Sequence, residues 1–259
     1  MTNEKLIEKL YTAGRQIKDF DVSMSIVRRE KGIPKILSNP EPDTIIAGLI
    51  YDLENEIREK GIKKAGKSDL LQAAKNILKS AKKCSYKPDL HTAFMCNENQ
   101  VFCDGFQALI LSGEKILDIE TNPRTVFNVI NSIPKTTEKT LVLPSIADLN
   151  IVLNEYKSLH TKQNPILRFY DEDKNLLIGF NPEFIINAIK ATGSNTLHFN
   201  RHNTAALVKS ENVDFLIMPV NVKSPETKGP GTYYYIDVDF TGVPALKWET
   251  VKLVVEKTA

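Results

Sequence analysis

The amino-acid sequence predicts an α+β protein in which helices alternate with short antiparallel strands, preceded by a helical N-terminal extension. After residue 68, segments with apolar residues at helical spacing are followed by short strand-like runs. Turns rich in Asn, Asp and Gly separate these runs, which is typical of hairpins. The first 67 residues do not show this alternation and are therefore treated as a separate extension.

Residues 1–67 make up the predicted N-terminal extension. Residues 4–19 carry apolar side chains at helical spacing, whereas residues 22–37 are ambiguous and begin with a strand-like alternation at 22–27. After two closely spaced prolines, Asp43 is placed to cap a second helix, which we expect to end at Gly61. The basic, glycine-containing stretch that follows is typical of a linker.

Residues 68–144 begin with a helix that we expect to start at Asp69, its N-cap, and to reach about residue 83. An Asn122-Pro123 pair, an N-cap with a proline in the first turn, predicts a second, shorter helix. Strands are expected at residues 92–96, 100–103, 106–111 and 139–143.

Residues 145–222 start again with a helix, for which Ser145 and Asp148 form a capping box. Another helix is predicted to open at Asn181-Pro182 and to end at Gly193. Strands are expected at residues 166–170, 176–180, 196–199, 204–208 and 214–218, and beyond residue 222 at 233–238 and 247–256.

The two Asn-Pro motifs are candidates for an internal sequence repeat. Both Asn122-Pro123 and Asn181-Pro182 are followed by apolar rows at the same spacing, and a strand follows each predicted helix. This agreement indicates a helix-plus-strands unit that is used more than once, although shared helix-capping chemistry alone also produces it.

Residues 175–222 contain two further motifs in order: Ile178-Gly179-Phe180-Asn181 before a predicted helix, and Ile217-Met218-Pro219-Val220 at the end of the last strand. This segment resembles the C-terminal repeat of the bacterial replicative sliding clamp, the DNA polymerase III beta subunit. A weaker similarity to the opening repeat of that family begins at Leu70 and includes the turn Cys103-Asp104-Gly105, where only the acid of the family's turn is retained.

The resemblance covers residues 68–222 and implies a DNA-clamp-like fold there. This region is either one domain with an insertion near residues 114–165, or two short repeats at 68–144 and 145–222. Residues 1–67 and 223–259 have no counterpart in the resemblance, so we expect a helical extension before the clamp-like region and a β extension after it.

A clamp encircles DNA with helices whose basic side chains meet phosphates without reading bases. Four lysines of the first predicted helix fall on one side of it, because steps of four and three keep side chains on one helical face. They are Lys75, Lys79, Lys82 and Lys83, with Lys190 on the later helix as a further candidate. A solvated helix face is the alternative interpretation of the same pattern.

The resemblance also implies a pocket for short peptides of polymerases and other clamp partners, lined by Leu216, Met218 and Pro219. In the family this motif ends the chain, whereas here the chain continues beyond it.

The composition is that of a soluble globular protein, with a formal net charge of only +2. DNA binding must therefore depend on how the charge is distributed. No apolar run is long enough for a membrane helix, and the N-terminus lacks the apolar core of a signal peptide. We expect a cytoplasmic protein with reduced cysteines at positions 84, 96 and 103, which lack metal-ligand spacing.

The sequence carries no signal for an enzyme, a cofactor or a metal. Glycine-rich nucleotide-binding loops and a Gly-x-Ser-x-Gly nucleophile elbow are absent. His198 and His202 lie in a predicted loop instead of on one helical face, and the acidic turn at 171–173 lacks the spacing of a calcium loop. The tyrosines at 233–235 fit a half-buried strand better than a base-stacking platform.

The resulting hypothesis is a clamp-like DNA-replication accessory protein that binds duplex DNA without sequence specificity and forms homo-oligomers. The alternative is an interaction or regulatory protein, from a phage or mobile element, that keeps the clamp fold without forming a ring.

Overall fold

The computed structural model describes residues 42–85, 87–113, 117–159, 164–220, 222 and 231–251. The helical segment expected at 4–19 and the ambiguous, strand-like segment at 22–37 lie outside these residues. The chain separates into two compact units, Met1–Gly66 and Lys67–Ala259.

The described part of the first unit is the helix α3 (Pro42–Lys64). The prediction that Gly61 ends this helix is wrong, since α3 continues through it at the modest cost of a glycine in a helix interior. The left-handed conformation that ends the helical segment is adopted by Gly66, with φ of 75°. Glu56 and Lys60, one turn apart, form an ion pair of 2.6 Å on its surface.

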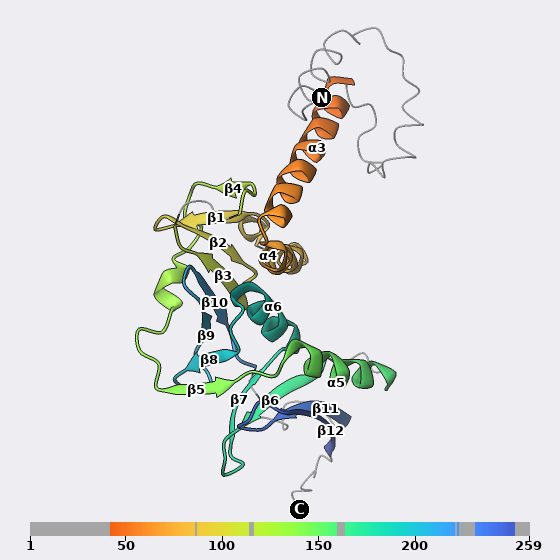
Figure 1. Ribbon diagram of the computed structural model, residues 1–259, viewed down its shortest axis with the longest axis vertical. Helices are drawn as coiled ribbons and strands as arrows, with labels where there is room; N and C mark the ends of the chain where they lie inside the picture. The colour runs from red at the N-terminus through yellow and green to blue at the C-terminus, as the bar shows by residue number, and fades with distance from the viewer. Residues whose placement is uncertain are drawn as a thin grey trace, which may run out of the picture. The chain divides into compact units, whose positions relative to one another are not determined.

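The described residues of the second unit form two sheets. The strands of the larger sheet are β1 (Ala93–Cys96), β2 (Asn99–Cys103), β3 (Gln107–Leu111), β4 (Thr121–Asn122), β5 (Lys139–Val142), β8 (Thr196–Phe199), β9 (Ala206–Lys209) and β10 (Val213–Ile217). They lie in the order β4-β1-β2-β3-β10-β9-β8-β5 (Figure 1). The antiparallel pairing of β3 with β10 joins strands from the two halves of the sequence into one continuous sheet.

The smaller sheet has the order β12-β11-β6-β7. Its strands are β6 (Ile166–Tyr170), β7 (Leu176–Phe180), β11 (Gly231–Val238) and β12 (Pro244–Val251). β6 and β7 form a hairpin, as do β11 and β12, and a parallel pairing of β6 with β11 joins the two hairpins. The α+β class predicted from the sequence is confirmed, whereas the division into 1–67, 68–222 and 223–259 stays a prediction.

Two helices, α4 (Ser68–Ala81) and α6 (Pro182–Thr192), pack against each other and against the larger sheet (Figure 1). The predicted N-cap of α4 is wrong: the helix begins at Ser68, and no side chain caps it. Asp69 lies instead in the first turn, where its charge is favourable to the helix dipole. The α6 prediction is confirmed, because Asn181 accepts a hydrogen bond from the Glu183 N–H and Gly193 ends the helix at φ of 68°.

A further described helix of this unit, α5 (Ile146–Ser158), packs against the smaller sheet. Its predicted cap is confirmed: the Ser145 hydroxyl accepts a hydrogen bond from the Asp148 N–H at 3.1 Å and donates one to the Asp148 carboxylate at 2.6 Å. The ring of Tyr156 meets the ring of Tyr234 edge-on, with centroids 5.6 Å apart. This contact fixes α5 over the face of the sheet on which Tyr234 lies.

The helix predicted after Asn122-Pro123 is wrong. The segment forms only one 3-10 turn, η2 (Val129–Ser132), and Asn122 itself belongs to β4. The Phe127 ring lies 5.6 Å from the Phe94 ring, and Val129 is buried in the core cluster of β1, β2, β3 and β10. These contacts extend the segment along the sheet, so the two Asn-Pro motifs do not share a structure.

No helix in the described part of the chain is long and apolar enough to cross a membrane.

Candidate functional site

The lysines predicted to meet DNA lie at and just beyond the C-terminal half of α4. Lys75 and Lys79 are exposed on the helix, Lys82 is its C-cap residue, and Lys83 follows it. The opposite side of α4 is buried, through Leu70, Leu71, Ala73, Ala74, Ile77 and Ala81. Lys190 is half-buried in the last turn of α6. The side of α4 that carries the lysines is thus turned away from its packed face.

A series of hydrogen bonds between side-chain amides links α4 to α6 and to the larger sheet. The Gln72 amide donates to Asn76 Oδ1 at 2.9 Å, and the Asn76 amide donates to Asn187 Oδ1 at 2.9 Å. Asn187, which is buried, in turn donates to Gln107 Oε1 at 3.2 Å. The exposed side of α4 is therefore held in place by directional contacts as well as by apolar packing.

The series of hydrogen bonds continues into the turn between β2 and β3. The Gln107 amide donates to Asp104 Oδ2 at 2.9 Å, while Asp104 Oδ1 accepts from the backbone N–H groups of Phe106 and Gln107 at 2.8 and 2.9 Å. Gly105 occupies the position of positive φ, 93°. The buried Asp104 carboxylate thus shapes a tight turn from which the Phe106 side chain projects, 57% exposed.

Beside this turn is a pocket of about 440 Å³, here called the Met218 pocket. Its lining includes Lys87, Asp89, Leu90, Cys103, Phe106, Ala108, Val126, Phe127, Val129, Ala205, Leu216 and Met218. Leu216 and Met218, two residues predicted to line a peptide pocket, are part of it, whereas Pro219 is not. Phe127 and Met218, each 41% exposed, make the open side apolar, with a lysine and an aspartate beside it.

The Met-Pro motif also connects the two sheets. The Met218 N–H donates to the Phe106 carbonyl at 2.8 Å, and the Val220 N–H donates to the Gly179 carbonyl of β7 at 2.8 Å. A Cβ at Gly179 would overlap the Val222 side chain, so glycine at this position leaves room for the close approach of the segment after Pro219. The motifs that carried the family resemblance therefore meet in space, at the backbone between β10 and β7.

The thiol of Cys103 is part of the pocket wall but has no reactive character. Burial, assisted by the nearby Asp104 charge, raises the pKa of Cys103 to about 11, although the Gly105 N–H opposes the shift. A thiol with this pKa is protonated at neutral pH and does not act as a nucleophile.

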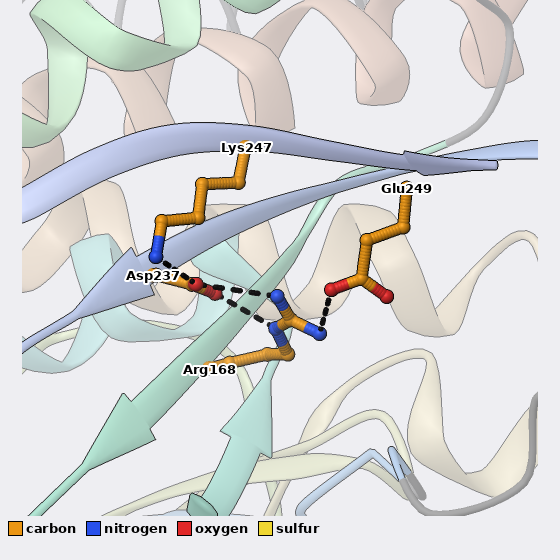
Figure 2. Close-up of polar contacts among 4 residues, drawn as sticks. All are labelled: Arg168, Asp237, Lys247 and Glu249. Atoms are coloured by element: carbon orange, nitrogen blue, oxygen red, sulfur yellow. Dashed lines mark hydrogen bonds and ion pairs between the residues drawn. The ribbon is translucent and has the colours of Figure 1, made fainter. Parts of the chain in front are cut away.

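The smaller sheet carries a charged cluster that sequence reasoning missed (Figure 2). Arg168 of β6 donates from Nε to Asp237 Oδ1 at 2.7 Å and from Nη2 to Asp237 Oδ2 at 3.2 Å. Its Nη1 lies 2.8 Å from Glu249, and Lys247 Nζ lies 3.0 Å from Asp237. The signal was an arginine between Leu167 and Phe169 in a strand, where a charge is costly unless it is paired.

Aromatic rings complete this cluster. The Arg168 guanidinium carbon lies 3.8 Å from the centroid of the Tyr235 ring and 5.8 Å from that of Tyr170. Burial lowers the pKa of Arg168, but the carboxylates of Asp237 and Glu249 raise it by more. Burial and the same acidic neighbours raise the pKa of both tyrosines. The cluster is a neutralised network that ties β6, β11 and β12 together.

The described residues contain no group of three or more His, Cys, Asp or Glu side chains placed to hold a metal ion. Burial and the Lys209 charge lower the pKa of His198. The Asp171 carboxylate accepts hydrogen bonds from the Asn175 backbone N–H at 2.7 Å and its amide at 3.1 Å, and these bonds lower its pKa. The acidic turn is therefore stabilised internally as a hairpin turn.

Similarity to known proteins is found in structure and not in whole-chain sequence. No protein-family model matches the sequence, and no curated protein matches it. Among solved structures, the chain is similar to a DNA polymerase sliding clamp from Bacillus subtilis, at 12% identity and a TM-score of 0.41, over 59% of this chain and 63% of that one. It is also similar to the Helicobacter pylori beta clamp bound to a DNA ligase peptide, at 14% identity and 0.42, over 59% and 63%.

A third similar structure is a putative DNA polymerase III beta subunit from Eubacterium rectale, at 15% identity and a TM-score of 0.37, over 49% of this chain and 55% of that one. The chain thus spans less than two thirds of the length of each of these proteins. These structures come from the family that residues 175–222 resemble in sequence.

Proposed function

We propose that this protein is a non-enzymatic, clamp-like DNA-replication accessory that contacts the backbone of duplex DNA, without sequence specificity, through the lysines of α4. The observation that supports this proposal most directly is the placement of Lys75, Lys79, Lys82 and Lys83 on and just after the exposed side of a helix whose other side is buried. Ammonium groups exposed in this way can contact the DNA phosphates, and such contacts do not distinguish one base sequence from another.

The electrostatic argument rests on local charge. With a net charge of only +2, long-range attraction to DNA is weak. The binding energy must therefore come from local contacts of the lysine row, which consists of Lys75, Lys79, Lys82 and Lys83. Each phosphate that is neutralised releases condensed counterions, and the logarithm of the binding constant falls by about 0.9 per contact for each unit of log salt. Four contacts would therefore give a slope of about −3.6.

The experiment measures fluorescence anisotropy of two duplexes of unrelated sequence between about 50 and 200 mM salt. Replacing Lys75 and Lys79 with glutamine should weaken binding to both duplexes equally and reduce the salt slope by about 1.8. The matched control is Lys157→Gln, in the last turn of α5. An equal affinity for the Lys75/Lys79 variant and the Lys157 variant would remove the lysine row from the proposal.

A ring would require several copies of the chain, so homo-oligomers are part of the proposal. Light scattering with and without primed circular DNA tests it at about 50 mM salt, where phosphate contacts are strongest. A strict monomer that ignores DNA under these conditions would contradict a clamp function.

The Met218 pocket supports a second activity, the docking of a short partner peptide. Leu216 and Met218 line the pocket together with the exposed rings of Phe106 and Phe127, which suits adjacent large apolar side chains as anchors. A labelled peptide with a leucine next to a phenylalanine is the probe. We expect Met218→Lys to weaken its binding at least tenfold, whereas Ile151→Lys on the exposed side of α5 leaves it unchanged.

The two experiments together separate the proposal from its alternative. Peptide binding without any DNA binding would favour an interaction protein that has the fold but does not form a ring. DNA binding that depends on Lys75 and Lys79 would favour the replication accessory.

A further inference from the structure

β12 is one of the two outer strands of the smaller sheet, and no described strand pairs with its outer edge. It runs for eight residues, and its inner edge is fully paired with β11 from Pro244 to Val251. The side chains of residues 247–250 are all exposed. A strand of this length with an open edge is a template for pairing with another strand.

Trp248 marks the middle of this edge. It lies opposite Tyr234, the residue that contacts α5, yet it is 67% exposed. A tryptophan with most of its surface in water at an open edge is typical of an interaction site, because its large apolar area is the kind that anchors interfaces. The apolar side chain therefore indicates a protein partner for this edge.

Charged residues often protect an edge strand from pairing, but the two in β12 are held by their own chain. The Lys247 ammonium lies 3.0 Å from Asp237, and the Glu249 carboxylate lies 2.8 Å from Arg168 (Figure 2). Both side chains therefore lie over the Arg168 face of the sheet. Their charges are also of opposite sign and sit symmetrically on either side of Trp248.

We infer that β12 pairs antiparallel with β12 of a second copy of this chain, about a two-fold axis that passes through Trp248. In a two-fold symmetric antiparallel pair, the residue numbers of any two residues that lie opposite each other add up to the same value. This value is even, because opposite residues point to the same face of the sheet and residues on one face of a strand are two positions apart. Centring on Trp248 places Lys247 opposite Glu249 of the other copy, twice. Centring on Lys247 or on Glu249 places like charges opposite each other, which is destabilising.

The paired edges form an eight-stranded sheet from two copies, with Trp248 next to its own counterpart on the α5 side. The Arg168 clusters of the two copies become linked through Lys247 and Glu249. Strand pairing alone makes a small interface, so we expect a weak dimer that is populated only above about micromolar concentrations. The inference is independent of DNA contact and of the Met218 pocket.

A charge-complementation experiment tests this pairing. The Lys247→Glu variant has glutamate at positions 247 and 249, and the Glu249→Lys variant has lysine at both of these positions. Each variant alone therefore places like charges opposite each other. A mixture of the two variants places opposite charges at both positions. Analytical ultracentrifugation above the micromolar range should find dimers for the unmodified chain, monomers for each variant alone, and dimers in the mixture.

Changes within each subunit are the same in the variant alone and in the mixture, so the mixture provides its own control. A mixture that stays monomeric while the unmodified chain dimerises would overturn the inference. So would a monomeric unmodified chain.

Cross-linking gives a second readout that does not depend on the charged residues. Trp248→Cys places two thiols opposite each other, with Cβ atoms about 5 Å apart, and should form a disulfide-linked dimer under mild oxidation. Thr250→Cys is the matched control, because its counterpart is displaced along the strand by about 14 Å. Cross-linking of Thr250→Cys that equals or exceeds that of Trp248→Cys would contradict the two-fold axis at Trp248.

Discussion

Arg168 and Asp237, which are 69 residues apart in the sequence, are register partners in the parallel β6–β11 pair and are joined by two hydrogen bonds of 2.7 and 3.2 Å. Both side chains are largely shielded from water, with 10% of each exposed. The pair lies where the β6–β7 hairpin joins the β11–β12 hairpin, so its removal tests what holds the smaller sheet together.

Replacing Arg168 with methionine should destabilise the fold by about 3 kcal/mol, because it leaves the Asp237 carboxylate buried with only Lys247 as a partner. Urea denaturation measures the loss. Lys247→Met, at a side chain that is 61% exposed, should cost less than about 1 kcal/mol. Comparable losses for the two variants would mean that the bidentate pair has no special role.

Asn187 holds α4, α6 and β3 together, so its replacement by leucine should cost about 2 kcal/mol. The change leaves the buried Gln107 amide oxygen and the Asn76 amide without their partner. Gln72→Ala, at the exposed end of the same series of hydrogen bonds, should change stability by less than about 0.5 kcal/mol. Hydrogen exchange of the α4 amides is expected to accelerate in the Asn187 variant alone.

Gly242→Ala should destabilise the protein more than Gly193→Ala. Both glycines have positive φ, 83° and 68°, which costs a residue with a Cβ about 1 kcal/mol. Only at Gly242 would the added Cβ also press on a neighbour, the Val142 side chain at 3.0 Å and its carbonyl at 3.3 Å. Thermal unfolding of the two variants tests this order, and a larger loss at Gly193 would contradict it.

Cys103 should make stability fall at alkaline pH. Its pKa rises to about 11 in the folded chain from an ordinary value of 9.0, so folding favours the protonated thiol. The contribution, on the order of 2–3 kcal/mol, is fully present below about pH 9 and is lost as pH rises through about 11. Unfolding free energies at about pH 8 and about pH 10.5 should therefore differ less in Cys103→Ala than in the unmodified chain.

The same burial predicts slow thiol chemistry. Cys103 should react with a thiol reagent at about pH 8 only as fast as the protein opens, whereas the partly exposed Cys84 reacts without opening. Equal rates for the two thiols would place Cys103 in a more open site.

Contacts between near neighbours in the chain account for the elements that the sequence predicts correctly. The N-caps at Ser145 and Asn181 and the end of α6 at Gly193 are of this kind, because each depends on hydrogen bonds and backbone angles within a few residues. The strands with alternating or apolar runs are predicted for a similar reason, since burial on a sheet leaves a period of two in the sequence.

Other features were beyond sequence reasoning because their causes are distant contacts. Asn122-Pro123 has the same local signals as Asn181-Pro182, but Phe127 and Val129 pack onto the larger sheet and no α-helix forms there. The Asp69 cap was also wrong, because α4 begins one residue earlier without a side-chain cap and packs against α6 and the larger sheet, which lie far away in the sequence.

The sequence by itself determined the α+β class, the positions of α5 and α6, and the lysine row of α4, because periodicity and capping are properties of neighbouring residues. Only the tertiary structure decided that β3 pairs with β10, that Phe106 and Phe127 join Leu216 and Met218 around one pocket, and that Arg168 meets Asp237. Those contacts join segments that are far apart in the chain. Their stability comes from burial and pairing after the chain has closed on itself, which no local pattern records.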